Sequence, residues 1–205
     1  MPAIPESRFS DATTRMARIA VTGRFQPFHI DHLALVLHAL SLAEQVLICI
    51  TNPDFRSLQP AAESAHRHLD AANPFTWFER LQFIEAALGH QGVARARYVI
   101  TPFPLETPAT WPAYVPAGTP QLLRIFSDWE REKSRRLHAG NYPVIELQGD
   151  PARRVSASDI RASMARGDDA WRELVPAGAQ AMLDAIGTQA LRRRCAGSVP
   201  GSAHG

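Results

Sequence analysis

Two histidines stand three positions apart, directly after a short apolar run near the start of the chain. His29 and His32 lie in the stretch VTGRFQPFHIDH, which continues from the apolar residues 19–21. If a helix begins here, both imidazoles fall on one face of its first turn, where free backbone N–H groups and the helix dipole favour an anion. Gly23 lets the backbone before them come close to a ligand. We expect this stretch to bind phosphate.

Further along the chain, a second helix start also carries side chains suited to anions. In VSASDIR, Ser156 or Ser158 can cap the following helix, and Arg161 lies one turn inside it. Asp159 stands three positions after Ser156, so the same pattern also fits simple helix initiation through a capping box. Two hydroxyls and a guanidinium at a helix start can bind a polyphosphate. Two such helix starts in one chain predict a nucleoside triphosphate site.

The elements that must position these residues follow from the distribution of apolar side chains. Continuous apolar runs predict buried strands, and apolar residues at three- and four-residue steps predict helices. The expected strands are 19–21, 46–50, 98–100, 122–126 and 144–147, and the expected helices are one from Ile30, 76–88, 128–138, one after VSASDIR, and two short ones near Trp171 and Pro176. We therefore expect an α/β fold with a Rossmann-like, doubly wound, mostly parallel sheet of five or six strands and short C-terminal helices. The Pro-rich segment 101–120 is expected to form a long functional loop.

Length and composition favour a single domain. The chain has 205 residues, of which 45% are hydrophobic, enough for one sizeable core. We expect a flexible arm over 1–16, a domain over 17–190 and a disordered basic tail over 191–205. Cys49 and Cys195 have no metal-ligand spacing and predict no disulfide. Without a signal peptide or a run of about 18 apolar residues, we expect a soluble, cytoplasmic protein with no membrane partner.

Four motifs, in order along residues 18–187, resemble those of a known family. GRFQPFHIDH is similar to the G-R-x-Q-P-F-H-x-G-H signature of the nucleotidyltransferase superfamily, and VSASDIR is similar to its S-x-T-x-x-R signature. NPFTWFER and WRELVP resemble the N-P-F-T-x-x-E-R and W-R-x-L-x-P motifs of the archaeal-type nicotinamide-nucleotide adenylyltransferases, the branch that the chain resembles most closely.

This resemblance implies adenylyl transfer, in which the phosphate of a pyridine mononucleotide, in its amide or acid form, attacks the α-phosphate of ATP and releases pyrophosphate. Such chemistry rests on positioning and charge neutralisation, with Mg2+ held mainly by the substrate phosphates and no protein metal site. The implied catalytic residues are His29, His32 and Arg161. The implied nucleotide-binding residues are Gly23, Arg24, Phe25, Gln26, Phe28, Asp31, Ser156 and Ser158, and the implied acceptor-binding residues are Phe75, Arg80 and Trp111.

The sequence departs from the family pattern near the phosphate sites. Asp31 replaces the glycine between the two histidines and adds a side chain where the base and ribose would approach the backbone. Aspartate is also a favourable residue for the first turn of a helix. Ala72 stands near a position where the family usually carries a basic residue, and Arg67 or Arg80 could supply that contact.

The loop that should hold the acceptor departs as well. Trp111 matches the tryptophan that stacks on the pyridine ring in the family, and it fits an anchor packed into the core equally well. The acidic and amide positions before it do not align, and Trp129 stands where an asparagine is expected. These departures leave open two alternatives: nucleotidyl transfer from ATP or CTP to a different phosphorylated acceptor, and a nucleotide-binding sensor with weak catalysis.

Charge and length exclude some other classes. Lys and Arg number 22 against 20 Asp and Glu, so we do not expect a nucleic-acid partner. The same balance, together with the absence of room for a tRNA-binding domain, argues against the class I aminoacyl-tRNA synthetases, which share a similar histidine signature. The sequence leaves the oligomeric state open, including a homo-oligomer.

Overall fold

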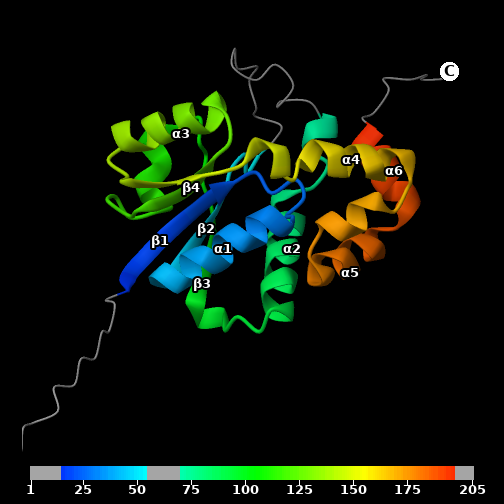
Figure 1. Ribbon diagram of the computed structural model, residues 1–205, viewed down its shortest axis with the longest axis horizontal. Coiled ribbons are helices and arrows are strands. Elements are labelled where there is room, and N and C mark those ends of the chain that lie inside the picture. Colours follow the sequence, from blue (N-terminus) through cyan, green and yellow to red (C-terminus); the bar gives the residue numbers. More distant parts are fainter. Residues whose placement is uncertain (1–14, 55–69, 197–205) are drawn as a thin grey trace, which may run out of the picture.

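The computed structural model describes residues 15–54 and 70–196, which form a five-stranded sheet flanked by helices (Figure 1). The strands are β1 (Met16–Gly23), β2 (Ala43–Ile50), β3 (Tyr98–Pro102), β4 (Gln121–Ile125) and β5 (Val144–Gln148). Their spatial order is β3-β2-β1-β4-β5, and every neighbouring pair is parallel. The strand order reverses between β1 and β4, which is the place where doubly wound sheets bind ligands. The predicted α/β fold is confirmed, with five strands.

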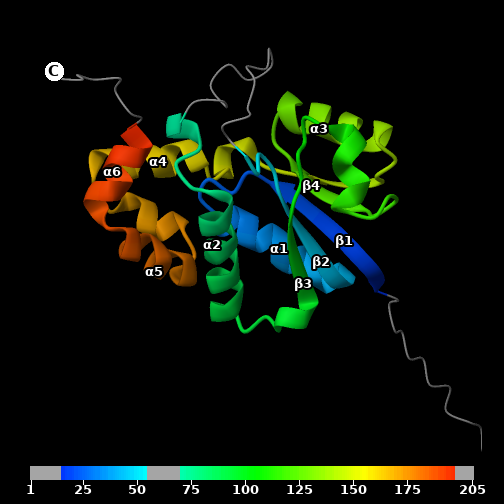
Figure 2. The same cartoon turned by 180° about the vertical axis from the view of Figure 1, so that it is seen from behind.

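Two hydrophobic cores lie on the two faces of this sheet, because successive strand residues point to opposite sides. Ile19 and Val21 of β1 belong to the core formed with α1 (Ile30–Leu42) and α2 (Trp77–His90). Ala20, between them, belongs to the other core, which contains Leu137 of α3 (Asp128–Ala139) and Trp111. Figures 1 and 2 show α3 apart from α1 and α2, across the sheet.

The Pro-rich segment contains more regular structure than predicted. Its first residues continue β3 to Pro102, and residues Pro108–Ala113 form a 3-10 helix with Pro108 in its first turn, a position where the missing N–H costs nothing. Trp111 on this helix is fully buried against Phe103 and Tyr142. The segment is therefore anchored in the second core by four of its residues, Phe103, Leu105, Trp111 and Val115.

The C-terminal region consists of three α-helices and a 3-10 turn placed beside α2. They are α4 (Ala157–Arg166), the 3-10 helix Ala170–Leu174, α5 (Ala177–Ile186) and α6 (Thr188–Ala196); further 3-10 turns cover Asp70–Ala72, Arg95–Arg97 and Pro151–Arg153. Gly178 of α5 packs so closely on α2 that a Cβ atom there would lie 2.1 Å from the Ala86 carbonyl oxygen. The C-terminal helices are thus docked on the main domain.

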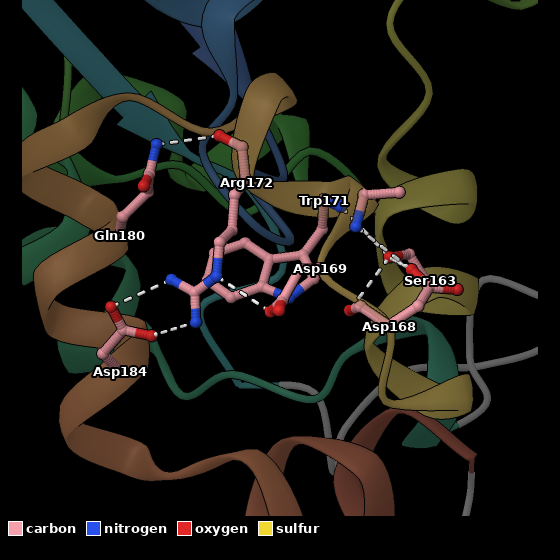
Figure 3. Close-up of polar contacts among 8 residues, drawn as sticks. Ser163, Asp168, Asp169, Trp171, Arg172, Gln180 and Asp184 are labelled. Carbon is pink, nitrogen blue, oxygen red and sulfur yellow. Dashed lines mark hydrogen bonds and ion pairs between the residues drawn. The ribbon is translucent and has the colours of Figure 1, made fainter.

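Polar contacts join α4 to the turn and helix that follow it (Figure 3). The Ser163 hydroxyl of α4 accepts a hydrogen bond from the Trp171 backbone N–H at 3.1 Å. The Arg172 guanidinium donates to both carboxylate oxygens of Asp184 on α5, at 2.8 and 3.0 Å, and to Asp169 at 2.9 Å. Although surface ion pairs contribute little individually, a bidentate pair fixes the orientation of the two segments.

The predicted disordered tail is wrong for residues 191–196, which lie in α6. Leu191 and Cys195 are one helical turn apart and both are buried, with the Cys195 sulfur 3.9 Å from the sulfur of Met164 on α4. The run of arginines between them obscured this two-residue apolar stripe in the sequence. Residues 1–14, 55–69 and 197–205 lie outside the described part of the chain, so most of the predicted arm, Arg67 and the end of the predicted tail lie there as well.

Within residues 15–54 and 70–196, no helix combines the length and the apolar character needed to cross a membrane.

Candidate active site

A cavity of about 470 Å³ opens at the carboxyl ends of β1 and β4. Thr22 and Gly23 of β1 and Leu123 and Arg124 of β4 form part of its lining. All of the catalytic and nucleotide-binding residues predicted from the sequence line it except Phe28, which is fully buried in the first core. The structure thus brings together two motifs that are far apart in the chain, at the switch point of the sheet.

His29 and His32 stack on each other at the start of α1. Their ring centroids are 3.6 Å apart with an interplanar angle of 27°. The His29 backbone N–H donates to Nδ1 of His32 at 3.4 Å, so the proton of the neutral His32 ring lies on Nε2. Nδ1 of His29 is buried and has no hydrogen-bond partner among the described residues. A buried polar atom without a partner in a cavity lining is typical of a site that a ligand completes.

Burial keeps both imidazoles uncharged near neutral pH. It lowers the pKa of His29 to about 4, with Asp31 opposing and Arg154 adding to the shift. Burial also holds the pKa of His32 well below its usual value, and the nearness of the His29 ring and of the charged Lys133 lowers it further. In the ligand-free protein the pair is therefore neutral and offers N–H donors at a helix N-terminus rather than fixed positive charges.

Gly23 is needed by the packing of the motif itself. Phe25 has a positive φ of 53° and its ring folds back, so that a Cβ atom on residue 23 would lie 2.7 Å from this ring. The same ring contacts the His32 imidazole edge-on, with centroids 4.9 Å apart. The glycine therefore allows Phe25 to support the histidine pair, in addition to placing backbone at the cavity surface.

Arg161 connects the two motifs directly. Its guanidinium donates to the Gln26 carbonyl oxygen at 2.7 Å and to the Ser158 hydroxyl at 3.0 Å, and the side chain is 8% exposed. Gln26 in turn exchanges two hydrogen bonds with the backbone of Phe75, at 2.8 and 3.1 Å. The planar guanidinium is thus held at the cavity lining by fixed acceptors, which suits it to bind an anion in one orientation.

Ser156 and Asp31 position the start of α4. Ser156 is the N-cap of α4, and its hydroxyl accepts hydrogen bonds from the backbone N–H groups of Ser158 and Asp159 at 3.2 and 3.4 Å. This is the capping role that the sequence suggested as an alternative to anion binding. The Asp31 carboxylate accepts from the Val155 backbone N–H at 2.8 Å. The residue that replaces the family's glycine therefore joins the first turn of α1 to the residue just before the second motif.

The three residues predicted to bind the acceptor do not line this cavity. Phe75 is fully buried beside Phe83 in the first core. The Trp111 indole is fully buried and donates to the Pro104 carbonyl oxygen at 2.9 Å, which corresponds to the core-anchor alternative. The acceptor-binding role of the three residues stays a prediction. To contact an acceptor in this cavity, their side chains would have to move towards it.

Arg80 is buried and binds backbone. Its guanidinium donates to the carbonyl oxygens of Arg24, Thr51 and Asn52 at 2.8 to 2.9 Å, and burial lowers its pKa to about 10. These oxygens belong to the segments that follow β1 and β2. Arg80 consequently holds in place the residues that directly follow β1 and β2 beside the cavity.

The part of the cavity lining near α3 was not predicted from the sequence. Trp129, Glu130 and Lys133 of α3 lie on it, together with Phe126 before this helix and Arg154 before α4. Arg154 pairs with Glu130 at 2.9 Å and lies over the Phe126 ring, 5.0 Å from its centroid. The spacing of Trp129 and Lys133, one helical turn apart, could have indicated a shared face, but not that this face meets a cavity.

Among residues 15–54 and 70–196, no group of three or more His, Cys, Asp or Glu side chains is placed to hold a metal ion. Asp31, the carboxylate nearest to the histidines in sequence, accepts the Val155 hydrogen bond.

Several known proteins are similar in sequence to this chain. Phosphonoformate cytidylyltransferase from Streptomyces viridochromogenes is 33% identical over 156 residues, which cover 76% of this chain and 84% of that protein. Nicotinamide-nucleotide adenylyltransferases from Ignicoccus hospitalis and Methanolobus tindarius are each 30% identical, over 171 and 175 residues. Each of these two alignments covers 83% of this chain, and they cover 92% and 90% of the relatives.

Solved structures agree on the fold. A bifunctional NMN adenylyltransferase/ADP ribose pyrophosphatase from Francisella tularensis superposes with a TM-score of 0.62 at 22% identity, over 88% of this chain and 53% of that chain. The chain thus spans about half the length of that protein. The cytidylyltransferase-like family matches residues 20–163, which contain both histidines, Lys133 and Arg161. This match covers most of the chain and contains both halves of the cavity, and the chain therefore belongs to the cytidylyltransferase-like family of nucleotidyltransferases.

Proposed function

We propose that the chain joins the AMP part of ATP to a pyridine mononucleotide, NMN or nicotinate mononucleotide, with release of pyrophosphate. The observation that carries this proposal is the convergence of the stacked His29–His32 pair and the Arg161–Ser158 pair on one cavity. The similarity to the nicotinamide-nucleotide adenylyltransferases supports the choice of ATP and of the acceptor. The product would be NAD or its acid analogue.

The reaction requires one P–O bond to form and one to break. An oxygen of the acceptor's phosphate attacks the α-phosphorus of ATP, and the bond from that phosphorus to the bridging oxygen of the leaving pyrophosphate breaks. Nucleophile and leaving group are both phosphates, so the chain need not provide a covalent nucleophile. Its task is to bring two anions together and to stabilise the charge that develops on the pyrophosphate.

The side chains divide this task by position. Neutral His29 and His32 would donate N–H groups to phosphate oxygens at the N-terminus of α1, where the helix dipole adds to the attraction. Arg161 would bind phosphate oxygens with a guanidinium that is already oriented by Gln26 and Ser158. An imidazole that gains a phosphate neighbour binds a proton more readily, so the pair could become charged as the substrate enters.

Nucleotidyltransferases of this family generally use a divalent metal ion, and we propose magnesium here. Bound mainly to the triphosphate, it would neutralise phosphate charge. The small number of protein carboxylates at the site fits an ion that arrives with the nucleotide.

Incubation of the purified chain with ATP, NMN and magnesium tests the proposal. Pyrophosphate release that depends on both substrates, with a dinucleotide identified by mass spectrometry, is the expected result. ATP replaced by CTP, GTP or UTP, and NMN replaced by nicotinate mononucleotide, define the selectivity. Dinucleotide binding without turnover would instead favour the sensor function.

A second candidate is cytidylyl transfer to a smaller anionic acceptor, favoured by two specific observations. Trp111, the expected pyridine-stacking residue, is fully buried away from the cavity. The phosphonoformate cytidylyltransferase is 33% identical, as similar as the adenylyltransferases. Pyrophosphate release with CTP and phosphonoformate, in the absence of release with ATP and NMN, would establish this candidate in place of the first.

A further inference from the structure

Lys133 is a buried cation that enters the cavity from α3. The side chain is only 8% exposed, although lysine is rarely buried, and it lines the cavity. Its ammonium donates a hydrogen bond to the Thr22 carbonyl oxygen near the end of β1. This contact holds the ammonium at the end of β1, whereas the side chains of Arg131 and Arg135 on the same helix are 55% and 73% exposed. Because burying a charged group costs free energy, a buried lysine in a cavity lining indicates a specific role for its charge.

The neighbours of Lys133 place its charge close to the reacting region. Burial lowers the pKa of His32 and raises that of Cys49 to about 12, and the positive charge of Lys133 adds to the first shift and opposes the second. The ammonium thus acts on groups of two different elements. Cys49 is the β2 partner of Thr22 in the parallel register. The ammonium therefore lies over the ends of β1 and β2, within electrostatic range of the histidine pair.

The cavity thus receives positive or donor groups from two opposite faces of the sheet. The starts of α1 and α4 supply the histidines, Arg161 and Ser158, and both helices contribute to the first core. Helix α3 contributes Leu137 to the second core and Lys133 to the cavity. These two groups of side chains approach a bound substrate from different directions.

The two groups of side chains match the geometry of in-line transfer, in which the attacking and leaving oxygens lie on opposite sides of the α-phosphorus. If the leaving pyrophosphate is held at the starts of α1 and α4, the acceptor must approach from the side of α3. We propose that Lys133 binds the attacking phosphate of the acceptor, which makes α3 the acceptor-binding element of this chain. This inference rests on the proposed nucleotidyl transfer, and it assigns the acceptor site to a helix outside the Pro-rich loop.

The role requires charge but no proton transfer. The acceptor's phosphate and the α-phosphate of the nucleotide are both anionic and repel each other as the new P–O bond forms. An ammonium beside the attacking group reduces that repulsion and holds the group in line while the bond to pyrophosphate breaks. Lysine acts here as a point charge, and its bond to Thr22 fixes where that charge lies.

Three α3 variants test the inference by steady-state kinetics with ATP and NMN varied separately. Lys133→Gln keeps an N–H donor for Thr22 and removes the charge, whereas Lys133→Arg keeps the charge. Arg135→Gln removes a cation of the same helix that is 73% exposed, paired with Glu132, and absent from the cavity lining. We expect Lys133→Gln to raise the KM for NMN about 10- to 100-fold, the range of a hydrogen bond to a charged group, and to leave the KM for ATP within a few-fold. Lys133→Arg should recover part of the loss and Arg135→Gln should match the wild type.

Several outcomes would overturn the inference. An unchanged KM for NMN in a folded Lys133→Gln variant would do so, and so would a rise confined to the KM for ATP. If Lys133→Gln proves unfolded by thermal denaturation, Lys133→Met replaces it as the uncharged variant. An unchanged KM for NMN in Lys133→Met, or a rise confined to the KM for ATP, would then contradict a contact to the acceptor.

The wild-type chain separates this inference from the proposed function. If it is inactive with ATP and NMN but active with CTP and phosphonoformate, the proposed function fails, and the same three variants then test Lys133 with phosphonoformate as the varied acceptor. If the wild-type chain is inactive with both substrate pairs, the proposed function and the inference fail together.

Discussion

The Asp31 carboxylate accepts a hydrogen bond from the backbone N–H of Val155, 124 positions away in the chain, at 2.8 Å. This contact joins the first turn of α1 to the segment that leads into α4, and so it sets the spacing of the two helix starts. A glycine, which the family signature carries here, could not make it. The aspartate therefore has a structural role, whatever its effect on a bound nucleotide.

Two substitutions at Asp31 separate its hydrogen bond from its charge. Asp31→Asn keeps a carbonyl oxygen for Val155 and removes a negative charge from the path of a polyanion, so we expect tighter ATP binding by a few-fold and unchanged stability. Asp31→Gly removes both, and the loss of a charge-assisted bond should lower the free energy of unfolding by about 1–2 kcal/mol. Titration calorimetry and urea denaturation measure the two effects. Weaker ATP binding by Asp31→Asn would mean that the carboxylate contacts the base or ribose.

Removal of either imidazole should affect turnover more than stability. We expect His29→Ala and His32→Ala each to lower kcat on the order of 100- to 1,000-fold, the usual effect of losing a donor to a developing anion. The thermal midpoint of each variant, measured beside the rate of pyrophosphate release, is the control for misfolding. Near-normal rates in both variants would contradict the mechanism proposed for the pair.

The burial of His29 predicts a specific dependence of stability on pH. Its pKa of about 4 lies below the ordinary 6.5, so between these values the unfolded chain binds a proton that the folded chain does not. The free energy of unfolding should therefore be unaffected by this group above about pH 6.5 and should fall as the pH drops towards 4, by on the order of 2–3 kcal/mol. Urea denaturation at about pH 7.5 and about pH 4.5 should show a smaller fall in His29→Asn. Equal falls in both proteins would rule out this burial effect.

Arg161→Lys should be damaging although it preserves the charge. A lysine cannot bind Gln26 and Ser158 together and still present two donors to a phosphate, so we expect the KM for ATP to rise about 10- to 100-fold. Arg166→Lys is the matched control, because Arg166 lies on the same helix, is exposed and pairs with Asp168. If both variants behave as the wild type does, Arg161 has no phosphate to bind.

Trp111→Phe distinguishes a core anchor from an acceptor-stacking residue. Phenylalanine would lose the bond to the Pro104 carbonyl and leave a void beside Tyr142, so we expect the free energy of unfolding to fall by about 2–3 kcal/mol and the KM for the acceptor to stay unchanged. A rise in the acceptor KM with little loss of stability would show that the indole reaches the substrate during turnover.

Much of the fold follows from local sequence patterns. The continuous apolar run that ends β2 and the stepwise Leu33, Val36 and Leu40 of α1 report burial directly, because both patterns are set by the geometry of the elements. Helix α6 was missed because its apolar stripe consists of two residues within an arginine-rich stretch. A helix that is stabilised mainly by docking leaves a weak local signal.

The site could be predicted only in part, and for a similar reason. Residues within the two motifs lie together because each motif is a short segment whose own turn and helix start place its side chains. Lys133 and Trp111 belong to segments whose placement depends on packing across the sheet. The sequence left Trp111 open between a ligand contact and a core anchor and made no prediction for Lys133. The structure buries Trp111 in the second core and places Lys133 in the cavity lining.

Arg80 has a consequence for how fast a nucleotide can bind. The Arg80 guanidinium ties Arg24, Thr51 and Asn52 to α2, so these residues become fixed when the chain folds. The loss of about 1–2 kcal/mol of backbone entropy per fixed residue is then a cost of folding instead of association. A triphosphate therefore meets these residues already in place. Its association rate should be set by diffusion and electrostatic attraction, and it should fall as the salt concentration rises. It should not level off at high nucleotide concentration because of a slow rearrangement of these residues.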